Sequence, residues 1–146
     1  MKISTRTRYG VRLMVSLGVH YGRGPVFLKD IARLEEISEK YLSQIIIPLK
    51  TAGLVNSFRG ARGGYVLAHD PKDIKLSRVV EVLEGGLDLV YCLDAPGRCS
   101  RVPGCAVRSL WRQVGDNVRR SLDGVTLEDL VRRRRDKEHS VVMYNI

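Results

Sequence analysis

Apolar residues recur in this chain mainly at three- and four-residue spacing, the period of amphipathic helices. The first two predicted helices cover residues 8–21 and 28–36, and a stretch rich in glycine with one proline separates them. A third helix is predicted over residues 38–52, with Ser38 as its N-cap and Gly53 at its end. The apolar face of this third helix comprises Leu42, Ile45, Ile46 and Leu49.

Two short strand-like runs follow, at residues 54–59 and 65–69. The segment Gly60–Gly64 between them is rich in glycine, so the pattern indicates a β-hairpin with a short loop. A helix, a turn, a second helix and then a hairpin is the element order of a winged helix-turn-helix.

The second half of the chain is also helical by pattern. An apolar stripe from Leu76 to Leu83 predicts one helix, and a longer stripe predicts another over about residues 105–122. Thr126 and Asp129 have the spacing of a capping box before a last helical segment. We expect the tail from Arg132 to fray, with the four arginines 132–135 solvated at a helix end.

These elements predict a mainly α-helical chain with one small β-hairpin. We expect a winged helix-turn-helix domain over residues 1–86, a cysteine-containing loop over 87–104, and a dimerisation helix with a C-terminal segment over 105–146. The apolar stripe of the long helix, which includes Trp111, is too long for so small a core and favours a subunit interface.

The charge distribution adds a class of partner. The net charge is +9, and residues 1–75 carry thirteen Lys or Arg against six Asp or Glu, a balance of +7. A basic first half suits neutralisation of DNA phosphates, although a merely basic surface would give the same count.

The third helix and the hairpin supply the candidate contacts to double-stranded operator DNA. The polar side of the helix can enter the major groove, and arginines among glycines suit a narrow minor groove. The predicted DNA-binding residues are Ser38, Lys40, Tyr41, Ser43, Gln44, Arg59, Arg62, Gly63 and Arg8.

The chain resembles a known family of bacterial regulators along most of its length. Matching residues are Lys2–Arg12, Ile37-Ser38, Tyr41-Leu42, Gln44, Leu49-Lys50, Gly53–Val55, Arg59-Gly60, Gly63–Tyr65, Val79–Gly85, the three cysteines and Leu110-Trp111. These residues resemble the Rrf2 family, the IscR/NsrR/CymR-type winged-helix regulators. The resemblance covers residues 2 to about 122 and implies a bacterial transcription regulator, homodimeric through the long helix. A cytoplasmic location is expected by default, because the chain has no apparent membrane span or secretory signal.

Three cysteines, Cys92, Cys99 and Cys105, lie within the predicted loop or at its end. Thiolates suit iron–sulfur clusters and zinc, although the spacing is not that of a zinc finger. The resemblance implies that these cysteines hold a 2Fe–2S or 4Fe–4S cluster. A thiol redox switch without metal is the alternative, because neighbouring arginines favour the thiolate form.

The fourth ligand of such a cluster is unknown. One branch of the family uses a histidine where this chain has Arg108, and another uses an acidic residue where it has Arg8. His20 and Glu84 are conceivable substitutes, as are a water molecule or a small thiol.

Other classes of protein fit the sequence less well. No apolar run reaches the roughly 18 residues that span a membrane, and no secretory signal follows the N-terminus. No Ser/His/Asp set or pair of carboxylates suggests an enzyme. Two rival hypotheses are a DNA-binding module that responds to another ligand, and a carrier of metal or clusters with a basic surface.

Overall fold

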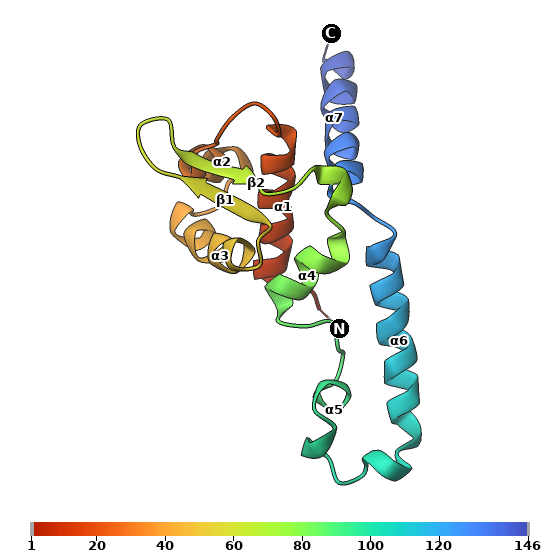
Figure 1. The fold of residues 1–146 in the computed structure, drawn as a ribbon. Coiled ribbons are helices and arrows are strands. Elements are labelled where there is room, and N and C mark those ends of the chain that lie inside the picture. The colour runs from red at the N-terminus through yellow and green to blue at the C-terminus, as the bar shows by residue number, and fades with distance from the viewer. Residues whose placement is uncertain (1, 146) are drawn as a thin grey trace.

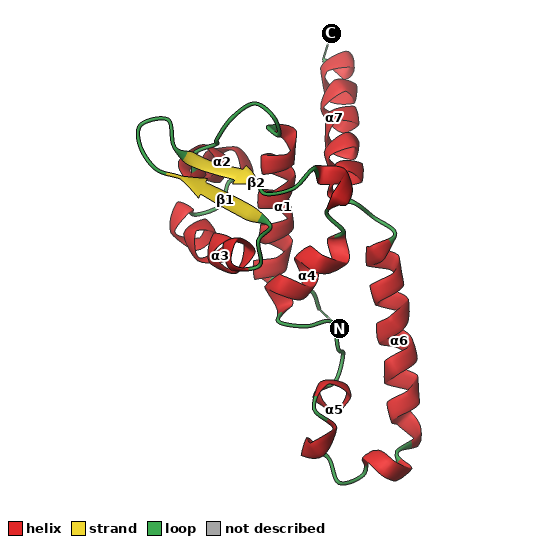
Figure 2. Cartoon of the chain, viewed as in Figure 1, coloured by secondary structure: helices red, strands yellow, loops and turns green. Residues whose placement is uncertain are grey.

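The computed structural model describes residues 2–145 and confirms a mainly helical chain with one two-stranded hairpin (Figures 1 and 2). The helices are α1 Thr5–Val19, α2 Leu28–Glu35, α3 Glu39–Thr51, α4 Leu76–Glu84, α5 Tyr91–Asp94, α6 Ala106–Asp123 and α7 Leu127–Tyr144. The strands are β1 Val55–Phe58 and β2 Gly64–Leu67. Short 3-10 turns occupy Pro71–Asp73, Pro96–Arg98 and Val102–Gly104.

Helix α1 begins three residues earlier than its apolar pattern predicts and ends two residues earlier. The hydroxyl of Ser4 accepts a hydrogen bond from the backbone N–H of Thr7 at 3.1 Å, so Ser4 is the N-cap. Helix α3 is capped as predicted, because the Ser38 hydroxyl accepts from the N–H of Tyr41. Gly53 follows that helix with a φ of 73°, a conformation that glycine adopts at little cost.

One hydrophobic core joins α1 to the helix-turn-helix and the hairpin. Helix α1 lies centrally, with Leu13, Met14 and Leu17 almost fully buried. Helix α3 buries all four residues of its predicted apolar face. Because each helix turns one apolar face to the same centre, α3 is held with its other face outward.

The hairpin is antiparallel, and Val55 pairs with Leu67 while Phe58 pairs with Gly64. The backbone of Val26, before α2, forms a bridge to Tyr65 with N···O distances of 3.0 and 2.9 Å. A Cβ atom on Gly64 would lie 2.5 Å from the Val26 carbonyl oxygen, so this close approach requires glycine. The hairpin is therefore fixed to the loop that enters the helix-turn-helix.

Helix α7 differs from the expected frayed tail, because it continues to Tyr144. The predicted capping box is present, with Thr126 and Asp129 each bonded to the other's backbone N–H. Leu127 and Val131 are buried in the core against α1. The C-terminal segment thus packs on the N-terminal unit, which the division at residue 105 did not anticipate. We call α1–α4, the hairpin and α7 the head.

Helix α6 stands apart from the head for most of its length (Figure 1). It has no buried residue, and its contacts with the head are chiefly with α4, where Ser77 donates a hydrogen bond to Asp123. The short helix α5 and the two following 3-10 turns lie at its far end. We call residues 87–123 the arm. Within residues 2–145, no helix has both the length and the apolar composition needed to cross a membrane.

Candidate nucleic-acid interface and cysteine segment

The polar face of α3 is free of the core. Ser38, Lys40, Ser43 and Gln44 are all exposed, and Ile47 on the same face is 60% exposed. The hydroxyl of Ser43 donates to the Lys40 carbonyl at 2.6 Å, which leaves its oxygen able to accept. The arrangement gives a row of hydrogen-bonding side chains over the first two turns, the part of such a helix that reaches base edges.

Tyr41 is placed differently from these four residues. Its ring is half-buried and meets the ring of Tyr9 edge to face, with centroids 5.9 Å apart. The guanidinium of Arg12 lies 5.6 Å from the centre of the Tyr9 ring. The Tyr41 ring therefore helps to hold α3 against α1, a role that the sequence pattern alone did not separate from DNA contact.

The hairpin loop presents two basic side chains. Arg59 and Arg62 are exposed, and neither forms an ion pair with another described residue. Gly63 is buried, and a Cβ there would lie 2.4 Å from the Phe58 carbonyl oxygen, so it shapes the loop. The loop and the N-terminal end of α3 lie on the same side of the head, away from α6 and α7 (Figure 1). The structure thus places the two segments that carry most of the predicted residues on one side of the head.

The N-terminus of α1 carries Arg6 and Arg8, both exposed. It is tied to α4, because the backbone N–H and the hydroxyl of Ser4 both donate to Glu84 at 3.0 and 2.9 Å. Burial opposes ionisation of Glu84, but hydrogen bonds from Thr7 and Ser4 outweigh it and lower the pKa of Glu84. Glu84, considered above as a cluster ligand, therefore already accepts hydrogen bonds within the head.

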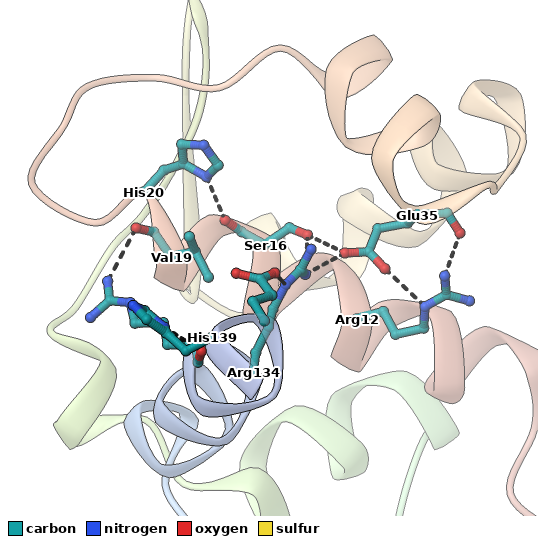
Figure 3. Close-up of polar contacts among 9 residues, drawn as sticks. Arg12, Ser16, Val19, His20, Glu35, Arg134 and His139 are labelled. Carbon is teal, nitrogen blue, oxygen red and sulfur yellow. Dashed lines mark hydrogen bonds and ion pairs between the residues drawn. The ribbon is translucent and has the colours of Figure 1, made fainter. Parts of the chain in front are cut away.

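A buried polar network, which the sequence analysis did not find, joins α1, α2 and α7 (Figure 3). Glu35 is at its centre and is 7% exposed. One carboxylate oxygen lies 3.0 Å from Arg12 Nε, and the other accepts from Ser16 and Arg134 at 2.5 Å each. Arg12 also donates to the Glu35 backbone carbonyl. Arg134 Nη1 donates to Ser16 at 3.1 Å as well.

The charges of this network are mutually compensating. Burial by itself raises the pKa of Glu35, but hydrogen bonds from Ser16, Arg134 and Arg12 and the charge of Arg134 bring the pKa below its ordinary value. Burial opposes the charge of Arg134, yet its contacts with Glu138 and Glu35 raise the pKa of Arg134. Arg134 is therefore not the solvated residue that the arginine run predicts, whereas Arg132, Arg133 and Arg135 are exposed.

The three cysteines are free thiols, each partly exposed. Cys92 lies on α5, Cys99 follows the turn Pro96–Arg98, and Cys105 is the N-cap of α6. Arg108 Nε donates to the backbone carbonyl of Cys92 at 3.3 Å, which links the first cysteine to the start of α6. The thiols thus lie at the end of the arm far from the hairpin (Figure 1).

The donor atoms suit an iron–sulfur cluster, but their arrangement does not. Thiolates are the usual ligands of such clusters. Among residues 2–145, however, no three His, Cys, Asp or Glu side chains are placed so that they could hold a metal ion. The positions that supply a fourth ligand in two branches of the resembled family are Arg108 and Arg8 here, and both are cations. The segment does not fit a cluster in this conformation.

Comparison with known proteins agrees with this architecture. The model of the Rrf2 family, described as iron-dependent transcriptional regulator, matches residues 3–133. The transcriptional regulator CymR of Bacillus subtilis is 45% identical over 130 residues, which is 89% of each chain.

Solved structures are similar to the chain over about nine-tenths of its length. The structure of CymR described as the global cysteine regulator of B. subtilis has 44% identity and a TM-score of 0.74, and the match covers 90% of this chain and 96% of that one. The structure of T. potens IscR has 40% identity and the same TM-score, with 92% and 88% covered. These relatives are regulators, in agreement with the expectation that the chain is not an enzyme. The chain belongs to the Rrf2 family of transcriptional regulators.

Proposed function

We propose that the chain binds operator DNA as a homodimer in the bacterial cytoplasm and that its cysteine segment adjusts this binding. The observation that carries the proposal is the shared side of the head on which α3 and the hairpin loop expose their polar and basic residues. The proposed roles are base contacts for Ser38, Ser43 and Gln44, phosphate contacts for Lys40 and Arg8, and minor-groove insertion for Arg59 and Arg62. Gly63 and Tyr41 support these contacts through the loop and the helix.

The dimer is inferred from the exposed apolar side of α6. Val107, Leu110 and Trp111 are 55%, 49% and 40% exposed, although they share one helical stripe. An apolar stripe of this kind needs a partner, and a second copy would cover it symmetrically. Two heads on paired α6 helices would present two α3 helices to successive major grooves, about 34 Å apart.

The sensor is inferred from the position of the thiols. Cys105 occupies the N-cap position of α6, and Arg108 connects that helix to Cys92, so a chemical change at the thiols can alter how α6 meets α4. The separation of the two α3 helices would then change while their side chains stay the same.

Two chemistries are supported by different observations. The family description as iron-dependent favours an iron–sulfur cluster held by Cys92, Cys99 and Cys105, after a rearrangement of the segment. The partial exposure of all three thiols, which leaves them accessible to oxidants, favours a metal-free redox switch. We place the cluster first because it accounts for all three cysteines, and a cysteine pair would suffice for a reversible disulfide.

Anaerobic purification followed by a visible absorption spectrum and assays of iron and sulfide separates these chemistries. Colour with bound iron and sulfide supports the cluster. A colourless protein whose operator binding changes with oxidant supports the thiol switch. The triple variant C92A/C99A/C105A is the control, and it should bind operator in a manner independent of oxidant and iron.

The DNA part has a separate test. The full chain is used to select sequences from a random duplex pool, and the selected duplex is compared with a scrambled one. Enrichment of one sequence family supports the proposal, and retention of DNA without any sequence preference contradicts it and favours the carrier hypothesis. If operator binding of the triple variant responds to oxidant as the parent does, the sensor proposal fails while DNA binding stands.

A further inference from the structure

We propose that Arg134, near the end of the chain, is a positioning residue for the DNA-reading helix α3. The inference rests on the proposed function of α3 and adds a residue outside the winged helix-turn-helix to it. Its basis is the contact between Arg134 and Glu35, residues that are 99 positions apart in sequence.

Glu35 lies at the point where the orientation of α3 is set. It is the last residue of α2, and Ser38, the N-cap of α3, follows three positions later. Glu36 between them has a φ of 54°, which is a left-handed conformation and costs a non-glycine residue energy. Surrounding contacts must therefore hold this turn, and those of Glu35 are among the few that are polar and buried.

Three groups hold the Glu35 carboxylate, and they come from two helices. Arg12 and Ser16 belong to α1, which shares the core with α3. Arg134 alone comes from α7, and its side chain is 21% exposed. It also binds Glu138 on its own helix at 3.0 Å, which fixes the guanidinium between two carboxylates.

Without the Arg134 side chain, α7 would still pack in the core and the Glu35 carboxylate would still have hydrogen-bond partners. Leu127 and Val131 keep the first turns of α7 in the core. Glu35 keeps Arg12 and Ser16, so no buried charge is left without a partner. The expected consequence is a looser tie between α7 and the α2–α3 turn, and productive groove contacts tolerate only small displacements of the helix.

The contact between Arg134 and Glu35 couples the arm to the α2–α3 turn. Three residues separate the end of α6 at Asp123 from the start of α7 at Leu127, and the backbone N–H of Leu76 in α4 donates to the Val125 carbonyl at 3.0 Å. A change in the angle between α6 and the head would displace α7, and the contact of Arg134 with Glu35 would transmit that displacement to the α2–α3 turn. We place Arg134 between the arm and the DNA-reading helix for this reason.

The test compares R134M with R133M, because both variants remove one positive charge from adjacent positions of α7. Arg133 is exposed and has no ion pair within residues 2–145. The probes are a duplex selected by the wild-type chain from a random pool and its scrambled version. We expect R134M to weaken binding of the selected duplex about tenfold and R133M less than twofold. Both variants should bind the scrambled duplex equally.

The ratio of the two affinities distinguishes positioning from loss of folded protein. Partial unfolding would weaken binding of both duplexes by one factor, whereas a misplaced α3 lowers the selected-to-scrambled ratio. In an E35Q background, R134M should cost less than threefold, because the two residues act as a pair. Should R134M fail to fold, R134Q against R133Q gives the same comparison with a polar side chain that also removes the charge.

The outcomes separate this inference from the proposed function. If the wild-type chain enriches no sequence, the proposed function fails and the positioning role fails with it. If it enriches a sequence and R134M keeps the selected-to-scrambled ratio of R133M, the positioning role is wrong and the proposed function stands. A lowered ratio for R134M alone, lost in the E35Q background, supports it.

Discussion

Helices α3 and α6 have the same kind of amphipathic pattern, but the apolar side of α3 is buried in the core and that of α6 is exposed. Helix α3 has 13 residues and buries the four that form its apolar stripe. Helix α6 has 18 residues and buries none of them within the single chain. An apolar stripe therefore predicts that a helix face will be covered, but it does not say whether the cover is the same chain or a second copy.

The difference also divides the energetics of the molecule. In the head, burial of leucine and isoleucine side chains supplies the free energy that holds the winged helix-turn-helix together. In the arm, Val107, Leu110 and Trp111 of α6 remain in contact with water and contribute little to folding of the isolated chain. We infer that the head folds as a unit and that the arm gains its stability from the proposed dimer.

The largest effect expected is on folding of the head. Leu42 of α3 is 0% exposed, and L42A should lower the free energy of unfolding by about 2–5 kcal/mol through lost burial and a cavity. The matched change in α6, L110A, should cost less than about 0.5 kcal/mol in a monomeric W111E background. Urea unfolding measures both. An equal cost for the two substitutions would show that α6 packs on its own head in solution.

Dimer formation gives the next largest effect. Trp111 lies on the exposed stripe of α6, so W111E should place a charge in each half of a symmetric interface. We expect the dimer to weaken at least about 30-fold, the scale of a central aromatic residue in an interface. Sedimentation equilibrium measures the dissociation constant. Q113E, which adds the same charge at another exposed position of α6, should leave it within about twofold; an unchanged W111E dimer would exclude this face as the interface.

The same comparison explains how much the sequence could reveal. Ser38, the hairpin glycines and the Thr126–Asp129 capping box were predictable, because each depends on residues a few positions apart. The position of Arg134 was not, since its partner Glu35 is 99 positions away and both look like solvated charges in sequence. The ties of Ser4 to Glu84 and of Leu127 to α1 were missed for the same reason. Local rules found the helix-turn-helix and the hairpin, and tertiary contacts determined what holds them in place.

The hairpin loop offers a smaller effect, confined to the head's exposed side. R62A should weaken binding of the selected duplex about tenfold and lower the salt dependence by about one counterion per subunit. The reason is that exposed Arg62 has no protein partner among the described residues and is free to contact DNA. Binding is measured at several salt concentrations, with R133A on α7 as the control for loss of charge. Equal effects of the two variants would argue against a hairpin contact.

The smallest effect concerns a contact within the head, between α7 and the end of α2. The pKa of Glu35 lies below its ordinary value in the folded chain, so the ionised carboxylate stabilises the fold above the unfolded pKa. This contribution is lost as the pH falls through the lower, folded pKa, from about pH 5 downwards. E35Q removes the charge and one of the two acceptor oxygens, because the amide nitrogen of glutamine only donates, so it should be less stable than wild type by about 1 kcal/mol at pH 7. The free energies of unfolding of the two proteins should converge in acid, as measured by urea unfolding at a series of pH values.

The control is E138Q, which alters the exposed partner of Arg134. Its stability should follow the wild-type pH dependence more closely, because Glu138 is 59% exposed. A constant gap between wild type and E35Q across this range would mean that the charge of Glu35 does not stabilise the head.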